Sequence, residues 1–384
     1  MLLSLILKNA LRHKLRTSLT LVGVTVAILA FGLLSTVVHA WYAGVDATSA
    51  SRLITRHAVS LVFSLPLSYQ QRIRAMHGVS GVAGANWFGG VYITERNFFP
   101  QFAVQAEQYF PLYPEFVVPD AQMKDFLHDR KGALVGQKLA DTYGWKIGDT
   151  VPIRGTIWPG NWAFTVRGIY HGIDQKTDQS QFFFHWDYLN ETAKVRYPRR
   201  ANMVGIYVIG LKEPMHAAEI ATLIDTGFRN TLAETLTETE KAFQLSFVSM
   251  TETILIAVRA VSYEVILIIL AVMANTMAMT ARERLPEYAT LKALGFSPGF
   301  VVLLIVGESI TIACLGGALG IALTYPAAAA FARAVGTLFP IFYVANETVL
   351  LQAGFAVLVG LIAALVPAWR ASRINIVRGL RSIA

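Results

Sequence analysis

Long apolar blocks alternate with polar segments along this chain. Four of these blocks are almost free of charge, and each is long enough to cross a bilayer, which takes about 20 residues of helix. They cover residues 19–39, 254–280, 300–325 and 349–367. The pattern predicts four transmembrane helices, of which the first is longer than the apolar core of a cleavable signal peptide and is expected to be retained.

Composition strengthens this interpretation. Hydrophobic residues make up 54% of the chain and charged residues only 15%, and the mean hydropathy is +0.47. Such values are typical of membrane proteins. The one cysteine, Cys314, lies in an apolar block, which excludes a disulfide framework and a thiolate metal site.

The basic residues are concentrated in the short polar segments. The segment before the first block carries Lys8, Arg12, Lys14 and Arg16 without an acidic residue, and the segment after residue 367 carries four arginines without one. Residues 41–250 are nearly neutral. The positive-inside rule therefore predicts that both termini and residues 281–299 are cytoplasmic and that residues 41–250 lie outside. The net charge of +8 reflects topology and gives no reason to expect nucleic-acid binding.

The segment between the first two blocks reads as an α+β domain. Helical spacing is expected over 66–76, 137–143 and 217–228, and short strands over 81–93, 102–106 and 133–135. Val151 and Ile153 alternate with polar residues, as do Phe164 and Val166, which predicts a hairpin. From Thr231 to Arg284 the chain contains neither glycine nor proline, so we expect one long helix that begins as a polar stalk and continues through the membrane.

The predicted fold is a membrane α-helical protein with four transmembrane helices, and an α+β extracytoplasmic domain is inserted between the first and second spans on a helical stalk. Residues 1–18 show helical spacing with a basic face, which favours an amphipathic helix on the inner leaflet. The predicted segments are this helix (1–18), the first span (19–40), the core domain (41–235), stalk and second span (236–281), a cytoplasmic loop (282–298), the third span (299–326), a short outer loop (327–347), the fourth span (348–367) and a basic cytoplasmic tail (368–384).

The cytoplasmic loop has the pattern of a short capped helix. Pro286 suits its first turn, Gly295 its C-cap, and Ser297 with Pro298 the start of the next helix. Leu285, Tyr288, Leu291 and Leu294 recur every three residues and predict a narrow exposed apolar ridge. Such a ridge suits the groove of a soluble partner, although a helix resting on the lipid would show the same pattern.

Candidate sites for chemistry are few. The chain has no Walker A, HExxH or GxSxG motif, so we expect neither a nucleotide site nor a catalytic site of its own. His171, Asp174, His185 and Asp187 are close in sequence, but solvated or packed side chains are more common than a metal site at such spacing, and we expect no metal. The aromatic stretch 97–116 suits either domain core or a ligand or adaptor contact.

Two features of the third block bear on packing and function. Glu308 is costly within a membrane unless it is paired or hydrated, so it is either a functional intramembrane acid or a structural carboxyl bonded to a neighbouring helix. Gly316 and Gly320 form a small-xxx-small pair that predicts close helix packing.

Four stretches together resemble permeases of the MacB/FtsX superfamily of ABC transporters. They are the basic lead LKNALRHKLRTSLTLVGVTVAI, the stretch GALVGQKLADTYGWKIGDTVPIRG, the loop RERLPEYATLKALGFSP and the ending PAWRASRINIVRGLR. Tyr288 and Ile376 depart from the family's usual Ile and Pro. The resemblance implies a coupling helix at about 286–294 that docks on a separate ATP-binding subunit, with Glu287, Tyr288, Leu291, Lys292 and Leu294 as coupling residues.

The resemblance also implies partners and a function. ATP and magnesium would be bound by the partner ATPase, and this chain would hold no cofactor. Further partners would be membrane lipids, a second copy or a paralogous permease as dimer, and a periplasmic adaptor with an outer-membrane channel. The function implied is ATP-driven export or extraction of an amphiphile by mechanotransmission in a bacterial inner membrane. The alternative is a signalling subunit that regulates a periplasmic cell-wall hydrolase, whereas a membrane-anchored enzyme would need reactive groups that the sequence does not show.

Overall fold

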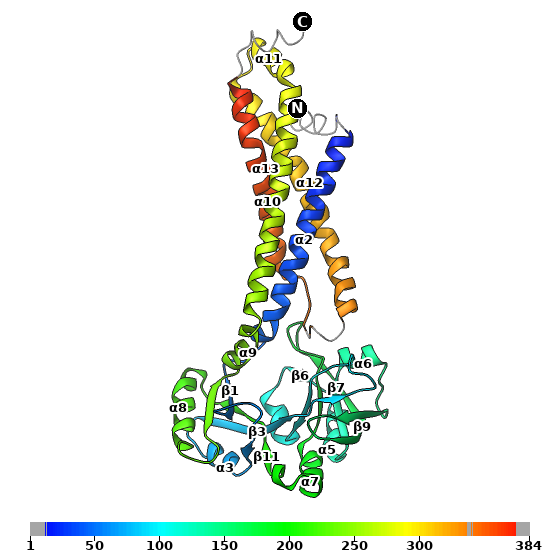
Figure 1. Ribbon diagram of the computed structural model, residues 1–384, viewed down its shortest axis with the longest axis vertical. Coiled ribbons are helices and arrows are strands. Elements are labelled where there is room, and N and C mark those ends of the chain that lie inside the picture. The colour runs from blue at the N-terminus through cyan, green and yellow to red at the C-terminus, as the bar shows by residue number, and fades with distance from the viewer. Residues whose placement is uncertain (1–11, 13, 336–338, 340, 374–384) are drawn as a thin grey trace. The chain divides into compact units, whose positions relative to one another are not determined.

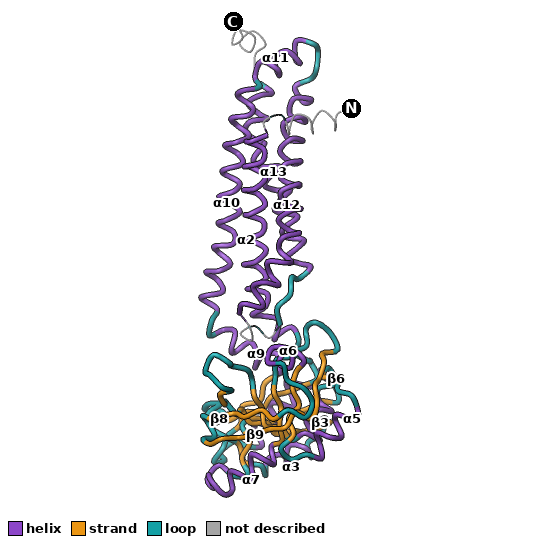
Figure 2. The backbone as a smooth tube through the Cα atoms, turned by 90° about the vertical axis from the view of Figure 1, so that its right-hand side faces the viewer, coloured by secondary structure: helices purple, strands orange, loops and turns teal. Residues whose placement is uncertain are grey.

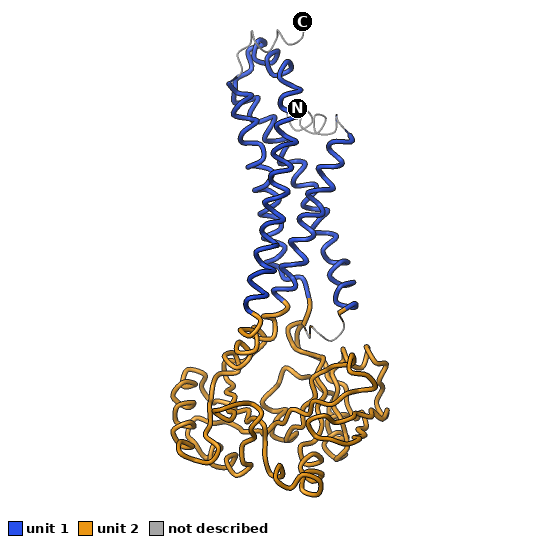
Figure 3. Tube along the Cα trace, viewed as in Figure 1, with its two compact units in different colours: residues 1–39, 252–334, 343–384 blue, residues 40–251, 335–342 orange. Residues whose placement is uncertain are grey.

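The computed structural model describes residues 12, 14–335, 339 and 341–373. The chain divides into two compact units (Figure 3). One comprises Met1–His39, Glu252–Ala334 and Tyr343–Ala384, and the other comprises Ala40–Thr251 and Val335–Phe342. We call them the helical unit and the α/β unit. Most of the amphipathic helix expected over 1–18 and most of the basic tail lie outside the described residues, while residues 14–18 form the start of a long helix.

Four helices of the described chain are long and apolar enough to cross a membrane. They are α2 (Lys14–Asp46), α10 (Glu252–Glu283), α12 (Pro298–Val335) and α13 (Asn346–Ser372), and they run side by side in two perpendicular views (Figures 1 and 2). Their facing sides share one apolar core, which includes Val24 and Phe31 of α2, Met273 of α10 and Val359 of α13. An α-helix pairs its backbone N–H and C=O groups internally except at its ends. The helical state therefore satisfies nearly all of the backbone where water is absent.

Two helices continue past the prolines that were expected to end them. The predicted third span stops at residue 326 and the fourth at 367, but Pro326 lies inside α12 and Pro367 inside α13. Helical structure therefore continues through 327–335, the first nine residues of the predicted outer loop 327–347. Alanines 327–330 favour the helix strongly, and a proline in a membrane helix is tolerated where neighbours satisfy the freed carbonyl.

The long helix expected from Thr231 is interrupted. Residues Thr235–Thr239 form strand β13, helix α9 covers Glu240–Ser249, and a turn at 250–251 precedes α10. The Thr-rich strand pairs with β1 (Arg52–His57), which offers β-branched residues a partner. At the turn, both the backbone N–H and the hydroxyl of Thr251 donate to Val248 O. Hydroxyl groups that bond nearby carbonyls compete with the regular helix in this way.

The α/β unit is built on a mixed sheet of eleven strands, ordered β13-β1-β12-β3-β5-β10-β7-β9-β8-β4 with β6 beside β9. The pairs β5–β10 and β7–β9 are parallel and the others are antiparallel. Strands β2 and β11 form a separate pair. The remaining bounds are β2 Leu65–Pro66, β3 Val79–Trp87, β4 Gly90–Val91, β5 Gln101–Val104, β6 Phe116–Val117, β7 Gly132–Gly136, β8 Thr150–Gly155, β9 Gly160–Gly172, β10 Phe182–His185, β11 Met203–Val204 and β12 Ile206–Leu211.

Strand β10 shows how the sheet separates two cores. Phe182 and Phe184 belong to one buried cluster, and Phe183 between them belongs to the other. Side chains alternate between the faces of a strand, so a run of apolar residues is buried on both sides only in the middle of a covered sheet. Helices supply the cover: α3 Tyr69–Arg74, α4 Ala106–Tyr109, α5 Asp120–His128, α6 Gln137–Tyr143, α7 Trp186–Arg196 and α8 Ala217–Gly227.

Several local predictions for this unit are confirmed. Helix α6 has the expected bounds, and β8 pairs with β9 as an antiparallel hairpin in which Val151 lies opposite Phe164. The aromatic stretch 97–116 is mostly core, since Phe99, Tyr109, Phe110 and Tyr113 are buried while Phe98 is exposed.

Candidate coupling site

The loop between α10 and α12 contains helix α11, Leu285–Ala293. Its C-terminus has the geometry of a Schellman motif. Phe296 N donates to Leu291 O at 3.1 Å and Gly295 N to Lys292 O at 3.0 Å, and Gly295 has a φ of 94°. A side chain would be strained there, so glycine is required. Ser297 Oγ then accepts from Phe300 N at 3.3 Å and caps α12. The expected caps are confirmed, and they hold α11 in a fixed direction.

The apolar ridge expected on this helix faces inward at Tyr288 and partly at Leu291. Tyr288 is only 2% exposed and packs with Val301 and Ile305 of α12 and Ala368 of α13. Leu291 packs partly on the same cluster, and burial raises the pKa of Tyr288 to about 12. The prediction of an exposed ridge is therefore wrong at Tyr288. Three-residue spacing identifies the apolar face of a helix but does not say whether the same chain or a partner covers it.

The outward side of α11 includes Leu294, the last residue of the predicted ridge, together with residues outside the ridge. Thr290, Ala293 and Leu294 are exposed at i, i+3 and i+4, which places them on one face, and Leu294 is 71% exposed. Phe296 follows with its ring stacked on Phe300 at 4.8 Å between centroids. We call Thr290, Ala293, Leu294 and Phe296 the outer face of α11. It is small, partly apolar and uncharged.

A buried ion pair anchors the start of α11. Arg284 Nη1 lies 2.8 Å from Glu308 Oε2, and both side chains are less than one-tenth exposed, at 8% and 7%. Arg284 Nε also donates to Glu287 Oε2 at 3.0 Å. Glu308 is thus a paired carboxyl bonded to a neighbouring segment. Arg284 was missed from the sequence as its partner, although a buried acid requires a nearby cation.

The two other basic contacts come from the chain around the start of α2. Arg16 forms two bonds of 2.7 Å to the carboxylate of Glu283, and Arg12 pairs with Glu287. Burial alone would raise the pKa of Glu287, but the hydrogen bonds from Arg284 and Arg12 outweigh it and lower this pKa. At the other end of α11, Lys292 Nζ donates to Ser372 O of α13 at 2.6 Å.

These bonds connect one short helix to all its long neighbours. Arg12 pairs with Glu287 of α11, and Lys292 of α11 donates to Ser372 of α13. Arg16 of α2 pairs with Glu283 at the end of α10, and Glu308 of α12 pairs with Arg284 between α10 and α11. Charge-assisted bonds of this kind have restricted geometry. A force on the outer face of α11 would therefore reach several apolar helices and not one alone.

Two family models match this chain, and together they cover residues of both units. The model of the MacB-like periplasmic core domain matches residues 17–226, more than half of the chain. The model of the FtsX-like permease C-terminal region matches residues 259–376, which include α11 and its flanking helices. The chain belongs to the MacB/FtsX family of ABC transporter permeases. The permease is accordingly a multi-pass bacterial membrane protein, and in this family the ATPase is a partner chain.

Two of the solved structures similar to the permease are of single domains or regions. The extracellular domain of the noncanonic ABC-type transporter YknZ from Gram-positive bacteria has 13% identity and a TM-score of 0.34, covering 49% of this chain and 100% of its own. The periplasmic region of MacB from Actinobacillus actinomycetemcomitans has 6% identity and a TM-score of 0.37, covering 53% of this chain and 95% of its own. No curated protein matches the permease significantly.

The glycines singled out in α12 of the permease lie against α2. A Cβ added to Gly316 would lie 2.9 Å from Val24 Cβ, and one added to Gly320 would lie 2.9 Å from Ile28 Cβ and from Thr25 O. Thr25 Oγ1 also donates to Gly316 O at 3.1 Å. Such separations leave no space for a side chain, so the two backbones touch, as in other small-xxx-small contacts.

The polar residues of the α/β unit are engaged in local structure. His185 Nε2 lies 2.7 Å from Phe126 O and is buried, while Asp174 accepts hydrogen bonds from its own loop. Within the described residues, no three His, Cys, Asp or Glu side chains are grouped in a way that could hold a metal ion.

Proposed function

We propose that this permease is the membrane subunit through which a separate ABC ATPase drives conformational change in an extracytoplasmic α/β unit, and that the resulting work exports or extracts an amphiphile. In this proposal α11 is the coupling helix. Its outer face is the part that touches the ATPase, and Leu294 is the main apolar contact. Glu287, Tyr288, Leu291 and Lys292, which the sequence placed among the contacts, instead hold the helix in position.

The observation that carries this proposal is the set of bonds at α11. A helix that only rested on the lipid would not need a buried Arg284–Glu308 pair and a bond from Lys292 to the end of α13. Buried charge pairs give little net stability, so their value is in fixing geometry. A rigidly held helix with a small apolar outer face is suited to filling a groove on a soluble partner.

The topology proposed with it follows the charge distribution. Arg12 pairs with Glu287 of α11 and Arg16 with Glu283 just before it, while Arg370 and Arg373 flank Ser372, which accepts from Lys292 of α11. Basic residues at this end of the spans support cytoplasmic termini and an extracytoplasmic α/β unit. Export is proposed over signalling on the resemblance of the core-domain stretch alone, and regulation of a cell-wall hydrolase is the alternative. A second permease chain and a periplasmic adaptor are further proposed partners, on the family resemblance alone.

Replacing Leu294 by aspartate should abolish ATPase binding while the permease stays folded. A charge on an exposed residue disturbs no internal contact, but it would be desolvated at the interface. Loss of a central apolar contact typically costs about 2 kcal/mol or more, or roughly 30-fold in affinity. The measurement is co-purification of an ATP-binding subunit, identified by mass spectrometry, with the tagged full-length chain from its own host.

Leu232→Asp is the matched control, since Leu232 is a fully exposed leucine of the α/β unit and should leave the ATPase bound. If Leu294→Asp retains the ATPase as well as the control does, the outer face of α11 is not the docking surface.

A further inference from the structure

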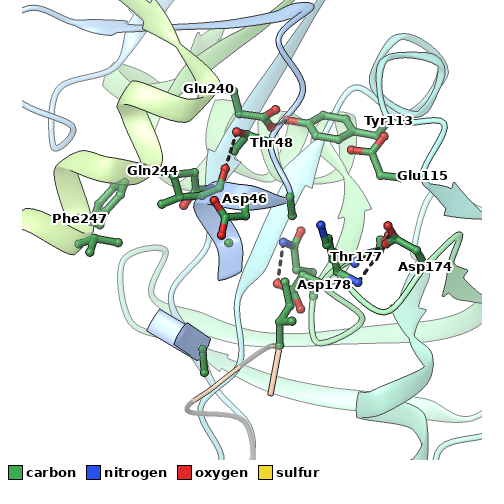
Figure 4. Close-up of a pocket in the computed structure, with 18 of the residues that line it drawn as sticks. Asp46, Thr48, Tyr113, Glu115, Asp174, Thr177, Asp178, Glu240, Gln244 and Phe247 are labelled. Carbon is green, nitrogen blue, oxygen red and sulfur yellow. Dashed lines mark hydrogen bonds between the residues drawn. The ribbon is translucent and has the colours of Figure 1, made fainter. Parts of the chain in front are cut away.

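The α/β unit contains a cavity of about 640 Å³ that the coupling function does not use. Its walls come from the end of α2, the segment around Tyr113, the loop after β9 and helix α9, all of them within this unit (Figure 4). The volume lies within the range of roughly 300–1,000 Å³ that is common for small-molecule sites.

One wall of the cavity is apolar. It is lined by Trp41 and Val45 of α2 and by Phe247 and Val248 of α9, and Ile173 of the loop after β9 also lines the cavity. Phe247 and Ile173 remain exposed although they are large and apolar. Apolar side chains that face a cavity without a covering neighbour favour an organic ligand over water.

The polar wall carries an excess of negative charge. Five carboxylates line the cavity, Asp46, Glu115, Asp174, Asp178 and Glu240, against Arg52 and Lys176. Lys138 is close to Asp178 but donates its hydrogen bond to Phe339 O. In Figure 4, Asp46 lies between Gln244 and Phe247 on one side and Thr177 and Asp178 on the other.

The carboxylates differ in how they are compensated. Glu240 and Glu115 share Arg52, at 2.7 Å and 2.6 Å. Asp178 accepts from Ser180 N and Oγ and from Gln181 Nε2, and Asp174 accepts from Lys176 N and Thr177. These donors carry no net charge, so they do not cancel the negative charge of the two carboxylates. Asp46 has no ion-pair partner among the described residues.

We infer that this cavity binds an amphiphilic organic cation, with its apolar body against α2 and α9 and its charge near Asp46 and Asp178. Carboxylates without the apolar wall would be typical of a solvated acidic surface. An apolar wall without the carboxylates would accept any lipid. Together they select positive charge on an apolar body, because an anion would be repelled and a small inorganic cation would leave the apolar wall wet. The idea that the permease transports this ligand rests on the proposed function. The idea that the cavity binds the ligand does not.

The test compares two dyes that share a xanthene ring system but differ in charge. Full-length permease is placed in phosphatidylcholine nanodiscs without ATPase, and binding of cationic rhodamine 6G and anionic fluorescein is followed by fluorescence anisotropy, with empty nanodiscs subtracted. Rhodamine 6G should bind saturably and more weakly as ionic strength rises, while fluorescein should not bind. Asp46→Lys should weaken rhodamine 6G about tenfold, since it reverses a charge facing the site.

Asp125→Lys is the matched control, because Asp125 is an exposed aspartate of α5 in the same unit and does not line the cavity. If Asp46→Lys does not fold by gel filtration, Asp46→Asn replaces it and should weaken binding about threefold. Equal binding of the two dyes, or equal losses at Asp46 and Asp125, would overturn the inference. Since no ATPase is present, such a failure would leave the coupling proposal intact, and a failure at Leu294 would leave this one intact.

Discussion

Replacing Arg284 by alanine should destabilise the helical unit by about 3–5 kcal/mol, because it leaves Glu308 buried without its counter-charge. The pair is formed at 2.8 Å between side chains that are almost fully buried, so the remaining carboxylate must be protonated or hydrated at a cost. We expect a large fall in the thermal midpoint of the full-length protein in detergent, followed by tryptophan fluorescence or by loss of monodisperse protein after heating.

Arg282→Ala provides the matched control, since Arg282 is an exposed arginine two positions away and should change stability by less than about 0.5 kcal/mol. The double variant Arg284→Met/Glu308→Leu removes both charges and should recover most of the loss, as for other buried pairs that are replaced together. A loss at Arg282 equal to that at Arg284, or no recovery in the double variant, would show that the pair is not what holds this segment.

Replacing Arg52 by alanine should destabilise the α/β unit by a similar amount, about 3–5 kcal/mol. Arg52 is 4% exposed and donates to Glu240, Glu115 and Leu112 O, and its guanidinium lies 4.2 Å from the centroid of the Tyr113 ring. Burial alone would lower the pKa of Arg52, but Glu240 and Glu115 raise it. Without Arg52, two carboxylates would face each other across Tyr113. Loss of protease resistance in the α/β unit of the full-length chain is the measurement.

Arg52→Lys should lie between alanine and the native residue, because lysine keeps the charge but cannot form the two-pronged bond to Glu115. The exposed Arg154 of β8 is the control position for Arg→Ala. The account of this network would be contradicted if lysine were no better than alanine, or if Arg154→Ala were as harmful as Arg52→Ala.

Local patterns in the sequence were sufficient for much of the fold. The four apolar blocks correspond to α2, α10, α12 and α13. Helix α6 and the β8–β9 hairpin were predicted from periodicity and from the glycines that end them. The caps of α11 were predicted from Gly295, Ser297 and Pro298. In each case the deciding interactions lie within a few residues of each other, where spacing and turn chemistry are informative.

The features that were missed depend on distant contacts. Whether Tyr288 faces a partner or its own chain depends on α12 and α13, and the fate of Glu308 depends on Arg284. The break before α10 depends on β13 joining β1. Helices α12 and α13 pass through Pro326 and Pro367, although proline usually marks a helix end. Tertiary contacts override local propensity at such positions.

We propose that α11 passes ATP-driven movement to the α/β unit through its polar bonds to the apolar helices. This transmission is tested most directly by hydrogen exchange in the reconstituted complex of permease and ATPase, with ATP analogue or ADP bound. In the native chain, ATP analogue should change exchange in α9 and at residues 40–49. In Arg284→Met/Glu308→Leu, the ATPase should still bind but this change should be largely lost. If the nucleotide does not change hydrogen exchange in the α/β unit of the native chain, or if the double variant shows the full change, α11 does not transmit the movement in this way.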